Sequence, residues 1–565
     1  MTSPTDLEIA RSRPLRPIGE VAAAAGIPPT ALVPYGHKMA KLALDFCHEA
    51  RSREAGTGLA RPSRLILVTA MTPTTAGEGK TTTSIGLADG LRRIGQRALL
   101  CLREPSLGPV FGAKGGATGG GQAQVAPMEE INLHFTGDFH AITSAHNLLA
   151  ALIDNHLHHG NTLGLAPASV ALRRVLDLND RALRQVVAGL GGRLNGPPRE
   201  SGFDITPASE VMAVFCLSKD LADLRRRLAA IVIGENETGE LLRAADLKAD
   251  GALAALLKDA LAPNLVQTLE GTPALVHGGP FANIAHGCNS VLATATALGL
   301  ADYVVTEAGF GSDLGAEKFF NIKCRQAGLR PAAAVIVATL RALRLHGGVA
   351  ASAVDAPDAQ AAAAGLSNLR RHVENVRRFG PRVVVALNRR TGDPADEIAL
   401  VRGLCAELGV RFAECDGWAR GGAGAAPLAE AVAEAAGAWD GTLRLTYPDE
   451  LPLLEKMERI AREVYGAEGV APEPAVRARL ERLQQRGFGT LPVCMAKTQY
   501  SFSADPKRLA APAGFTIPIR EVRLSAGAGF VVALTGDILT MPGLPRVPSA
   551  EQIGLDPEGH IVGLR

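Results

Sequence analysis

The chain has 565 residues, which is too long for a single hydrophobic core and predicts about three or four domains. A hydrophobic content of 47% predicts a well-buried globular protein and argues against a disordered one. The formal net charge of +2 is balanced, so it favours neither nucleic acid nor an anionic membrane as the main partner.

The eight cysteines are scattered along the chain and form no Cys-x-x-Cys pair. Several lie inside apolar runs, which is typical of buried free thiols in a reducing compartment rather than of disulfides or zinc ligands. The first residues show no basic region followed by an apolar core, and no stretch is apolar enough to span a bilayer. We therefore expect a cytoplasmic protein.

The first buried strand is predicted over 65–70, and a helix is predicted over 82–94. Between them lies a turn that ends in Gly-Lys-Thr at the start of the helix. This order of strand, turn and helix is the context that a phosphate-binding loop requires. We predict that the nucleotide-binding residues are Thr74, Thr75, Ala76, Gly77, Glu78, Gly79, Lys80, Thr81 and Thr82.

The residues of this loop have distinct expected roles. Backbone N–H groups face the anion, Lys80 reaches the outer phosphates, and the Thr81 hydroxyl can hold Mg²⁺. The usual pattern has glycine at position 74, where this chain has Thr74. The alternative is an ordinary strand-to-helix turn with a surface lysine, but the flanking strand and helix favour the phosphate site.

A second strand is predicted over 98–102, and Arg103 and Glu104 follow it directly. A glycine-rich run over 111–121 comes next and contains Lys114. Such a run is also typical of a flexible linker, although this one lacks serine. Because glycine lets the backbone approach a ligand and arginine offers a planar fork for carboxylate or phosphate, we favour a ligand-binding role.

The stretch over 162–271 has a largely helical pattern, and we interpret it as an all-helical or mixed insertion. The α/β pattern then resumes with strands predicted over 274–276, 303–305, 335–340, 383–387 and 411–415. Each of these strands is followed by a polar turn that contains glycine. Since ligands of open α/β sheets bind at the carboxyl ends of the strands, we expect one large cleft there.

Near the end of the chain, a run over 490–496 precedes Lys-Thr-Gln-Tyr-Ser, and another strand is predicted over 529–534. The fold class is therefore α/β: a P-loop-type core domain with a mostly parallel sheet, and two further α/β domains. The expected nucleotide-binding domain combines residues 1–115 with 260–380. A helical or mixed domain over 116–259 is inserted into it, and 381–565 form the C-terminal domain.

Several of these stretches resemble the formate–tetrahydrofolate ligase family, along nearly the full length of the chain. The matching stretches are residues 72–81, 103–106, 111–121, 307–311, 337–348 and 541–545. Signatures of this length and number are highly specific.

The resemblance implies ATP-dependent formylation of tetrahydrofolate at N10 through formyl phosphate. It also implies Mg²⁺, activation by a monovalent cation (K⁺ or NH₄⁺), and a three-domain subunit in a homotetramer. The chain has no additional dehydrogenase or cyclohydrolase region, so it resembles the single-activity form. The expected partners are formate, tetrahydrofolate and ATP, with neither nucleic acid nor a membrane.

The resemblance also assigns roles to individual residues. Lys80 and Arg103 are the expected catalytic residues, of which the first holds the triphosphate and the second neutralises formate and then formyl phosphate. Glu104 resembles the family's monovalent-cation ligand. Trp418 resembles an aromatic residue that lines the folate or nucleotide pocket, although core packing is the alternative for this side chain.

One turn departs from the family. After the strand that ends at residue 387, the family usually has Asn-Arg-Phe-Pro-Thr-Asp, whereas this chain has Arg390 and Thr391 in place of phenylalanine and proline. Arginine can also stack on a flat ring, so we predict a ring-binding role for Arg390.

Two other functions remain open from the sequence. The main alternative is a P-loop ATPase switch of the partitioning or cofactor-insertion type, which leaves the second glycine run and the long C-terminal half unexplained. The other is a binding or structural protein, if the changes at Arg390 and Thr391 have abolished catalysis.

Overall fold

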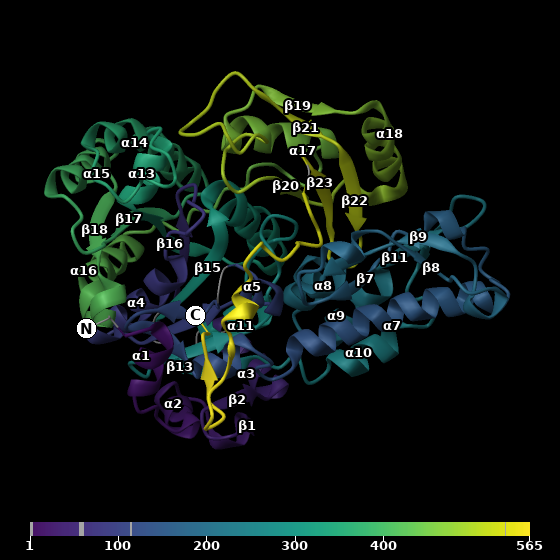
Figure 1. Cartoon of the computed structure of the whole chain (residues 1–565), viewed down its shortest axis with the longest axis horizontal. Helices are drawn as coiled ribbons and strands as arrows, with labels where there is room; N and C mark the ends of the chain where they lie inside the picture. The colour runs from purple at the N-terminus through teal and green to yellow at the C-terminus, as the bar shows by residue number, and fades with distance from the viewer. Residues whose placement is uncertain (1–3, 56–61, 114–115, 537, 565) are drawn as a thin grey trace.

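The computed structural model describes residues 4–55, 62–113, 116–536 and 538–564. Figure 1 shows a large central sheet with helices on both faces, an inserted segment to one side, and a C-terminal part above them. The order of strands along the sheet is β1 (Leu32–Tyr35), β2 (Met39–Leu42), β13 (Asn264–Thr268), β14 (Pro273–Val276), β4 (Ala98–Leu102), β15 (Tyr303–Gly311), β3 (Arg64–Ala70), β16 (Pro331–Ala338), β17 (Arg382–Asn388) and β18 (Arg411–Cys415).

From β14 to β18 every neighbouring pair of strands in this sheet is parallel. The strands β1, β2 and β13 pair antiparallel at the other edge, and the hairpin of β5 (Gly119–Gly120) and β6 (Ala123–Ala126) is attached to β13. The carboxyl ends of the parallel strands therefore lie along one edge of the sheet, as the sequence predicts.

Alternate residues of the strands supply the two hydrophobic cores. In β3, Ile66 and Val68 pack in one core with helices α4 (Lys80–Arg93) and α16 (Gly417–Gly437). Leu65 and Leu67 pack in the other core, on the opposite face. That face is covered by α3 (Leu44–Ala55), α11 (Val291–Leu298), α13 (Leu340–His346) and α14 (Ala359–Arg378). Because both faces are covered, the central strands are composed mainly of apolar residues.

The predicted strands are confirmed, with changes at their ends. The strand predicted over 303–305 continues to Gly311, so residues expected in a turn belong to the sheet. The sheet also runs past the boundary expected between residues 380 and 381, because parallel pairing joins β17 to β16 and β18 to β17. The division of the chain into three domains stays a prediction.

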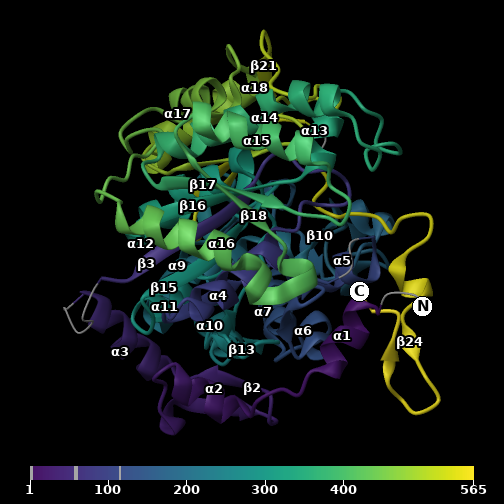
Figure 2. The same cartoon turned by 90° about the vertical axis from the view of Figure 1, so that its left-hand side faces the viewer.

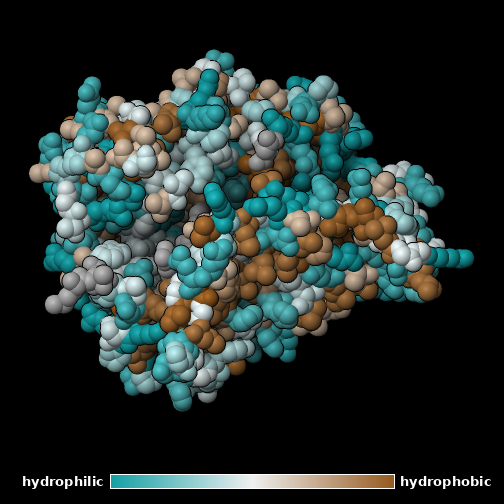
Figure 3. Space-filling view, viewed as in Figure 1, coloured by the Kyte–Doolittle hydropathy of each residue, from teal (hydrophilic) through white to brown (hydrophobic). Residues whose placement is uncertain are grey.

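The inserted segment is mixed, which is one of the two alternatives that the sequence left open. Its helices are α7 (Asp138–His158), α8 (Glu210–Leu217), α9 (Leu221–Ala230) and α10 (Asp250–Leu257). Its strand pairs are β7 (Arg174–Leu176) with β10 (Phe203–Ile205), β8 (Val186–Ala188) with β9 (Arg199–Ser201), and β11 (Val232–Glu235) with β12 (Leu241–Arg243). Hydrophobic residues form a band over this segment in Figure 3.

The C-terminal part has its own hydrophobic core. It contains α17 (Leu453–Ile460), α18 (Pro474–Leu483), the pair β19 (Gly469–Pro472) and β21 (Thr516–Ile519), and the sheet of β20 (Val493–Ala496), β23 (Phe530–Leu534) and β22 (Glu521–Ser525). The last residues of the chain lie beside α1 (Asp6–Ser12), as Figure 2 shows. Leu7 of this helix and Leu564 share a small apolar cluster. None of the helices in the described ranges combines the length and apolarity that crossing a membrane requires.

Candidate active site

The predicted phosphate loop connects the end of β3 to the start of α4. Gly79 immediately precedes the helix and has φ +74°, in the left-handed region that favours glycine. A Cβ atom at Gly79 would lie 2.3 Å from Nδ2 of Asn388, at the end of β17. The same Nδ2 donates to the Glu78 carbonyl at 3.0 Å. The positive φ and the close approach of the Asn388 side chain both favour glycine at position 79.

Thr74 is accommodated without glycine, because it is not among the described residues with positive φ. Its N–H donates to Glu78 Oε1 at 2.6 Å, and Glu78 Oε2 accepts from the Thr339 hydroxyl at the end of β16. The buried Glu78 carboxylate thus holds the loop from inside the protein. The tip of the loop, from Thr75 to Gly77, is exposed.

The first residues of α4 lie at the carboxyl edge of the sheet. The Thr81 hydroxyl donates to Glu307 Oε2 at 2.9 Å, while Thr82 is buried in the helix. Lys80 is the first helical residue, directly after Gly79. This placement agrees with a phosphate-binding lysine, whose role stays a prediction.

Arg103 follows β4, and its guanidinium reaches the end of the neighbouring strand β15. Nη2 lies 3.7 Å from Glu307 Oε1, and Nη1 donates to the Pro280 carbonyl at 3.3 Å. Its Nε–H is buried and has no hydrogen-bond partner among the described residues. Glu307 therefore joins the start of α4 to Arg103, and the guanidinium keeps a buried donor for a further acceptor.

Glu104 is 5% exposed, and burial raises the pKa of its carboxyl well above the usual value. The carboxylates of Asp138 and Asp177 raise this pKa further, whereas Lys41 opposes them. Lys41 Nζ lies 2.7 Å from Asp138 Oδ1, and Glu104 Oε2 has no partner within the described ranges. The described residues contain no group of three or more His, Cys, Asp or Glu that could hold a metal ion.

Trp418 lies at the start of α16 and is 47% exposed, so core packing does not explain this side chain. Its carbonyl accepts from the Gln122 N–H at 2.7 Å, and a Cβ at Gly121 would lie 2.1 Å from that carbonyl oxygen. The end of the glycine run thus forms the hairpin of β5 and β6 beneath Trp418 instead of a linker. The predicted ligand contact of Lys114 lies outside the described residues.

Arg390 is exposed, and its Nη1 lies 3.3 Å from Asp355 Oδ1. Its N–H donates to Asp393 Oδ2 at 2.8 Å. A cavity of about 400 Å³ lies here, and it is lined by Arg341, Arg344, Asp355, Pro357, Arg390, Thr391, Gly392 and Asp393. The turn that departs from the family therefore borders a cavity at the carboxyl ends of β16 and β17.

Glu307 and Asn388 are functional candidates that the sequence did not single out. Each lies where an apolar strand reaches the carboxyl edge of the sheet. That position could have found them, as could the family resemblance, because Glu307 begins the matching stretch 307–311 and Asn388 begins the turn that was compared with the family. Glu307 contacts Thr81 and Arg103, and Asn388 contacts Glu78; these partners are 204 to 310 positions apart, so no local pattern contains the contacts.

A mostly parallel sheet with covered faces, whose central strand β3 leads through a loop to Gly-Lys-Thr at the start of α4, defines a P-loop-type α/β protein. Over residues 4–565 the chain matches the family model for formate–tetrahydrofolate ligase, and it belongs to this family. It is 61% identical over 561 residues to the formate–tetrahydrofolate ligase of Acidiphilium cryptum (strain JF-5), covering 99% of this chain and 100% of the relative. It is 62% identical over 562 residues to that of Paracoccus denitrificans (strain Pd 1222), with the same coverage.

Proposed function

We propose that the chain uses ATP to join formate to N10 of tetrahydrofolate through formyl phosphate, giving 10-formyltetrahydrofolate, ADP and phosphate. One observation carries this proposal: Glu307 links the start of the phosphate-loop helix to Arg103. A group suited to triphosphate and a group suited to a carboxylate therefore lie at neighbouring strand ends. The family match along the chain supports this reaction over the P-loop ATPase switch.

The chemistry explains why both groups are needed. Formate is a poor electrophile because its carboxylate is anionic and its oxygen is a bad leaving group. Transfer of the γ-phosphoryl group of ATP to formate gives a mixed anhydride, which the N10 amine attacks with release of phosphate. Lys80 and the loop amides would hold the triphosphate as charge moves to the leaving ADP. Arg103 would neutralise formate and then formyl phosphate.

The residues present fit the ions that this reaction implies. The Thr81 hydroxyl and the Glu307 carboxylate are hard oxygen donors that suit Mg²⁺, which would neutralise charge on the phosphates when bound. Glu104 would be one ligand of a monovalent cation, K⁺ or NH₄⁺. The buried Oε2 of Glu104, which has no hydrogen-bond partner among the described residues, supports this assignment, as do the carboxylates of Asp138 and Asp177 nearby.

The exposed Trp418 ring, over the glycine hairpin, would bind the folate or nucleotide ring, and Arg390 would stack on a flat ring from its cavity. We also propose a cytoplasmic homotetramer. Exposed apolar side chains of the inserted segment support an oligomeric surface: Leu178, Val187, Leu190 and Leu194 are 41%, 49%, 66% and 90% exposed.

The test is ADP release measured with and without formate and with and without tetrahydrofolate. A ligase releases ADP only when formate is present, and tetrahydrofolate accelerates the release. ADP release that ignores formate would instead indicate an ATPase switch. No release under any condition would favour a binding or structural protein.

A further inference from the structure

Thr72 begins the phosphate loop, and side chains hold each of its polar groups. Its N–H donates to Asn368 Oδ1 at 3.2 Å, and its carbonyl oxygen lies 3.0 Å from His346 Nε2. Its hydroxyl accepts from Asn368 Nδ2 at 3.0 Å and lies 2.9 Å from His372 Nε2. The residue is fully buried, so these contacts fix where the loop leaves β3.

The side chains that hold Thr72 are held in turn by the C-terminal part. Ala510 N–H donates to His346 Nδ1 at 3.1 Å, and the Ala510 carbonyl accepts from Asn368 Nδ2 at 2.7 Å. Because His346 accepts at Nδ1, its proton is at Nε2, which donates to Thr72. Burial lowers the pKa of His346 to about 4, so this neutral form persists at neutral pH. Two of the three side chains that contact Thr72, His346 and Asn368, therefore connect it to Ala510 in the C-terminal part.

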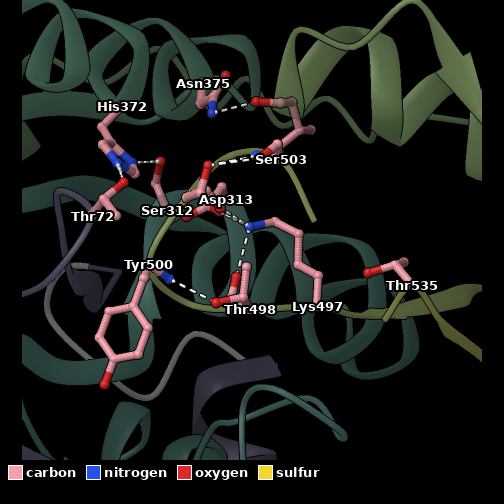
Figure 4. Close-up of polar contacts among 12 residues, drawn as sticks. Thr72, Ser312, Asp313, His372, Asn375, Lys497, Thr498, Tyr500, Ser503 and Thr535 are labelled. Atoms are coloured by element: carbon pink, nitrogen blue, oxygen red, sulfur yellow. Dashed lines mark hydrogen bonds and ion pairs between the residues drawn. The ribbon is translucent and has the colours of Figure 1, made fainter. Parts of the chain in front are cut away.

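A buried ion pair fixes the stretch of chain that leads to Ala510. This ion pair lies close to His372, the third side chain that contacts Thr72. Lys497 Nζ lies 2.7 Å from Asp313 Oδ2, with both side chains buried, and it also donates to the carbonyls of Thr498 and Ser501. Asp313 belongs to the π-helix Ser312–Ala316, whose Ser312 hydroxyl lies 2.7 Å from His372 Nδ1. Figure 4 shows Lys497 and Asp313 pointing toward one another, and His372 between Thr72 and Ser312.

We propose that the C-terminal segment 497–510 is a positioning element of the phosphate loop, which acts on Thr72 through His346, Asn368 and His372. This role does not require any residue of the segment to touch a substrate. The ion pair of Lys497 with Asp313 fixes the segment, and the segment fixes the side chains around Thr72. The proposal rests on the proposed function only for its kinetic readout, because nucleotide affinity can be measured without turnover.

The test compares two buried lysines of the C-terminal part. Lys456 Nζ donates to the carbonyls of Gly489 and Leu491 at 2.7 and 3.0 Å, and like Lys497 it is fully buried. It has no contact with the residues around Thr72 in the described structure. We expect Lys497→Met and Lys456→Met both to lower the Tm, because each removes a buried hydrogen-bonded charge.

Lys497→Met alone should reduce kcat/KM for ATP, by roughly 10- to 100-fold, because small displacements of a positioned group have effects of that size. The formate KM should change less than twofold. Titration calorimetry with the ATP analogue AMP-PNP should show a weaker Kd for Lys497→Met and an unchanged Kd for Lys456→Met. Equal effects of the two substitutions on nucleotide Kd would overturn the proposal. A parent without formate-dependent turnover would contradict the proposed function alone.

A second pair of variants covers the case in which Lys497→Met does not fold. Asn368 and Asn375 are both buried on α14, and both contact the C-terminal part. Asn375 Nδ2 donates to the Val464 carbonyl at 2.8 Å, whereas only Asn368 also contacts Thr72. Asn368→Ala should weaken AMP-PNP binding about tenfold, and Asn375→Ala should leave it unchanged. Unchanged binding in both variants contradicts a positioning role.

Discussion

Two regions of the molecule contain arginines that could meet an anion, and they differ in what those arginines contact. One is a cavity of about 700 Å³ between the inserted segment and the C-terminal part, and it is lined by Arg173, Arg479, Arg482, Arg486 and Arg523. Of these, Arg173, Arg486 and Arg523 pair with Asp204, Glu235 and Glu521, at 3.8, 2.8 and 2.6 Å. At the carboxyl ends of the strands, by contrast, the buried Nε–H of Arg103 has no hydrogen-bond partner among the described residues, and the start of α4 lies nearby.

The comparison teaches that volume alone does not identify a phosphate site. Anion binding needs donors that the protein itself leaves available, and backbone N–H groups at a helix start supply them. The strand-end region has this feature because the loop after β3 leads into the first turn of α4. In the larger cavity, carboxylates already contact three of the five arginines in the lining. The following predictions test this difference, in order of expected effect.

Lys80→Ala should have the largest effect. The substitution removes the charge expected at the outer phosphates, so turnover should fall by orders of magnitude while the fold remains intact. Steady-state ADP release and thermal unfolding measure the two quantities. Arg486→Ala, in the larger cavity, is the matched control, and it should keep turnover within about twofold. Turnover of Lys80→Ala within a few-fold of the parent would remove the phosphate-loop assignment.

Arg103→Ala should separate the two substrates. Truncating one partner of a buried charge pair typically costs about 2–5 kcal/mol. We therefore expect formate affinity and turnover to collapse while nucleotide binding persists. Calorimetry with nucleotide and kinetics with varied formate provide the measurements. Loss of nucleotide binding with unchanged formate kinetics would reverse the assignment.

Gly79→Ala should weaken nucleotide binding more than Gly77→Ala. Both glycines have left-handed φ, of +74° and +77°, so both substitutions carry a strain of roughly 1–2 kcal/mol. Only at Gly79 would the new methyl group meet Asn388, since nothing lies within 4 Å of a Cβ at Gly77. The difference in nucleotide Kd between the two variants measures how strongly a contact with Asn388, at the end of β17, affects nucleotide binding. Equal values would show that Asn388 can move away without consequence.

The double substitution Arg390→Phe with Thr391→Pro should have the smallest effect. An exposed cation over a ring contributes about 0.5–1 kcal/mol, similar to the aromatic pair that it replaces. Salt screens a charge but not apolar stacking, so only the parent's folate KM should rise across a salt series. The folate KM of parent and variant, measured at several salt concentrations, tests this. If the parent is inactive and the variant gains turnover, the natural turn has disabled the site.

The sequence by itself determined the class of fold and the place of the strand, loop and helix where the phosphate site is predicted. The strand over 65–70 and the helix after it follow from apolar runs and from Gly79, and the strand over 411–415 matches β18 residue for residue. These features depend on neighbours within a few positions. The family signatures are also continuous stretches of chain, so they could be recognised without any knowledge of the strand order.

Only the tertiary structure decided which side chains meet. Thr81 and Glu307 are 226 positions apart, and Thr72 and Asn368 are 296 apart. They meet because the sheet places β15 and β16 on either side of β3, an order that follows from long crossovers rather than from local pattern. Tertiary pairing likewise extended β15 to Gly311 and kept β17 in the main sheet. The sequence located the loop, and packing across the sheet determined the contacts that hold it.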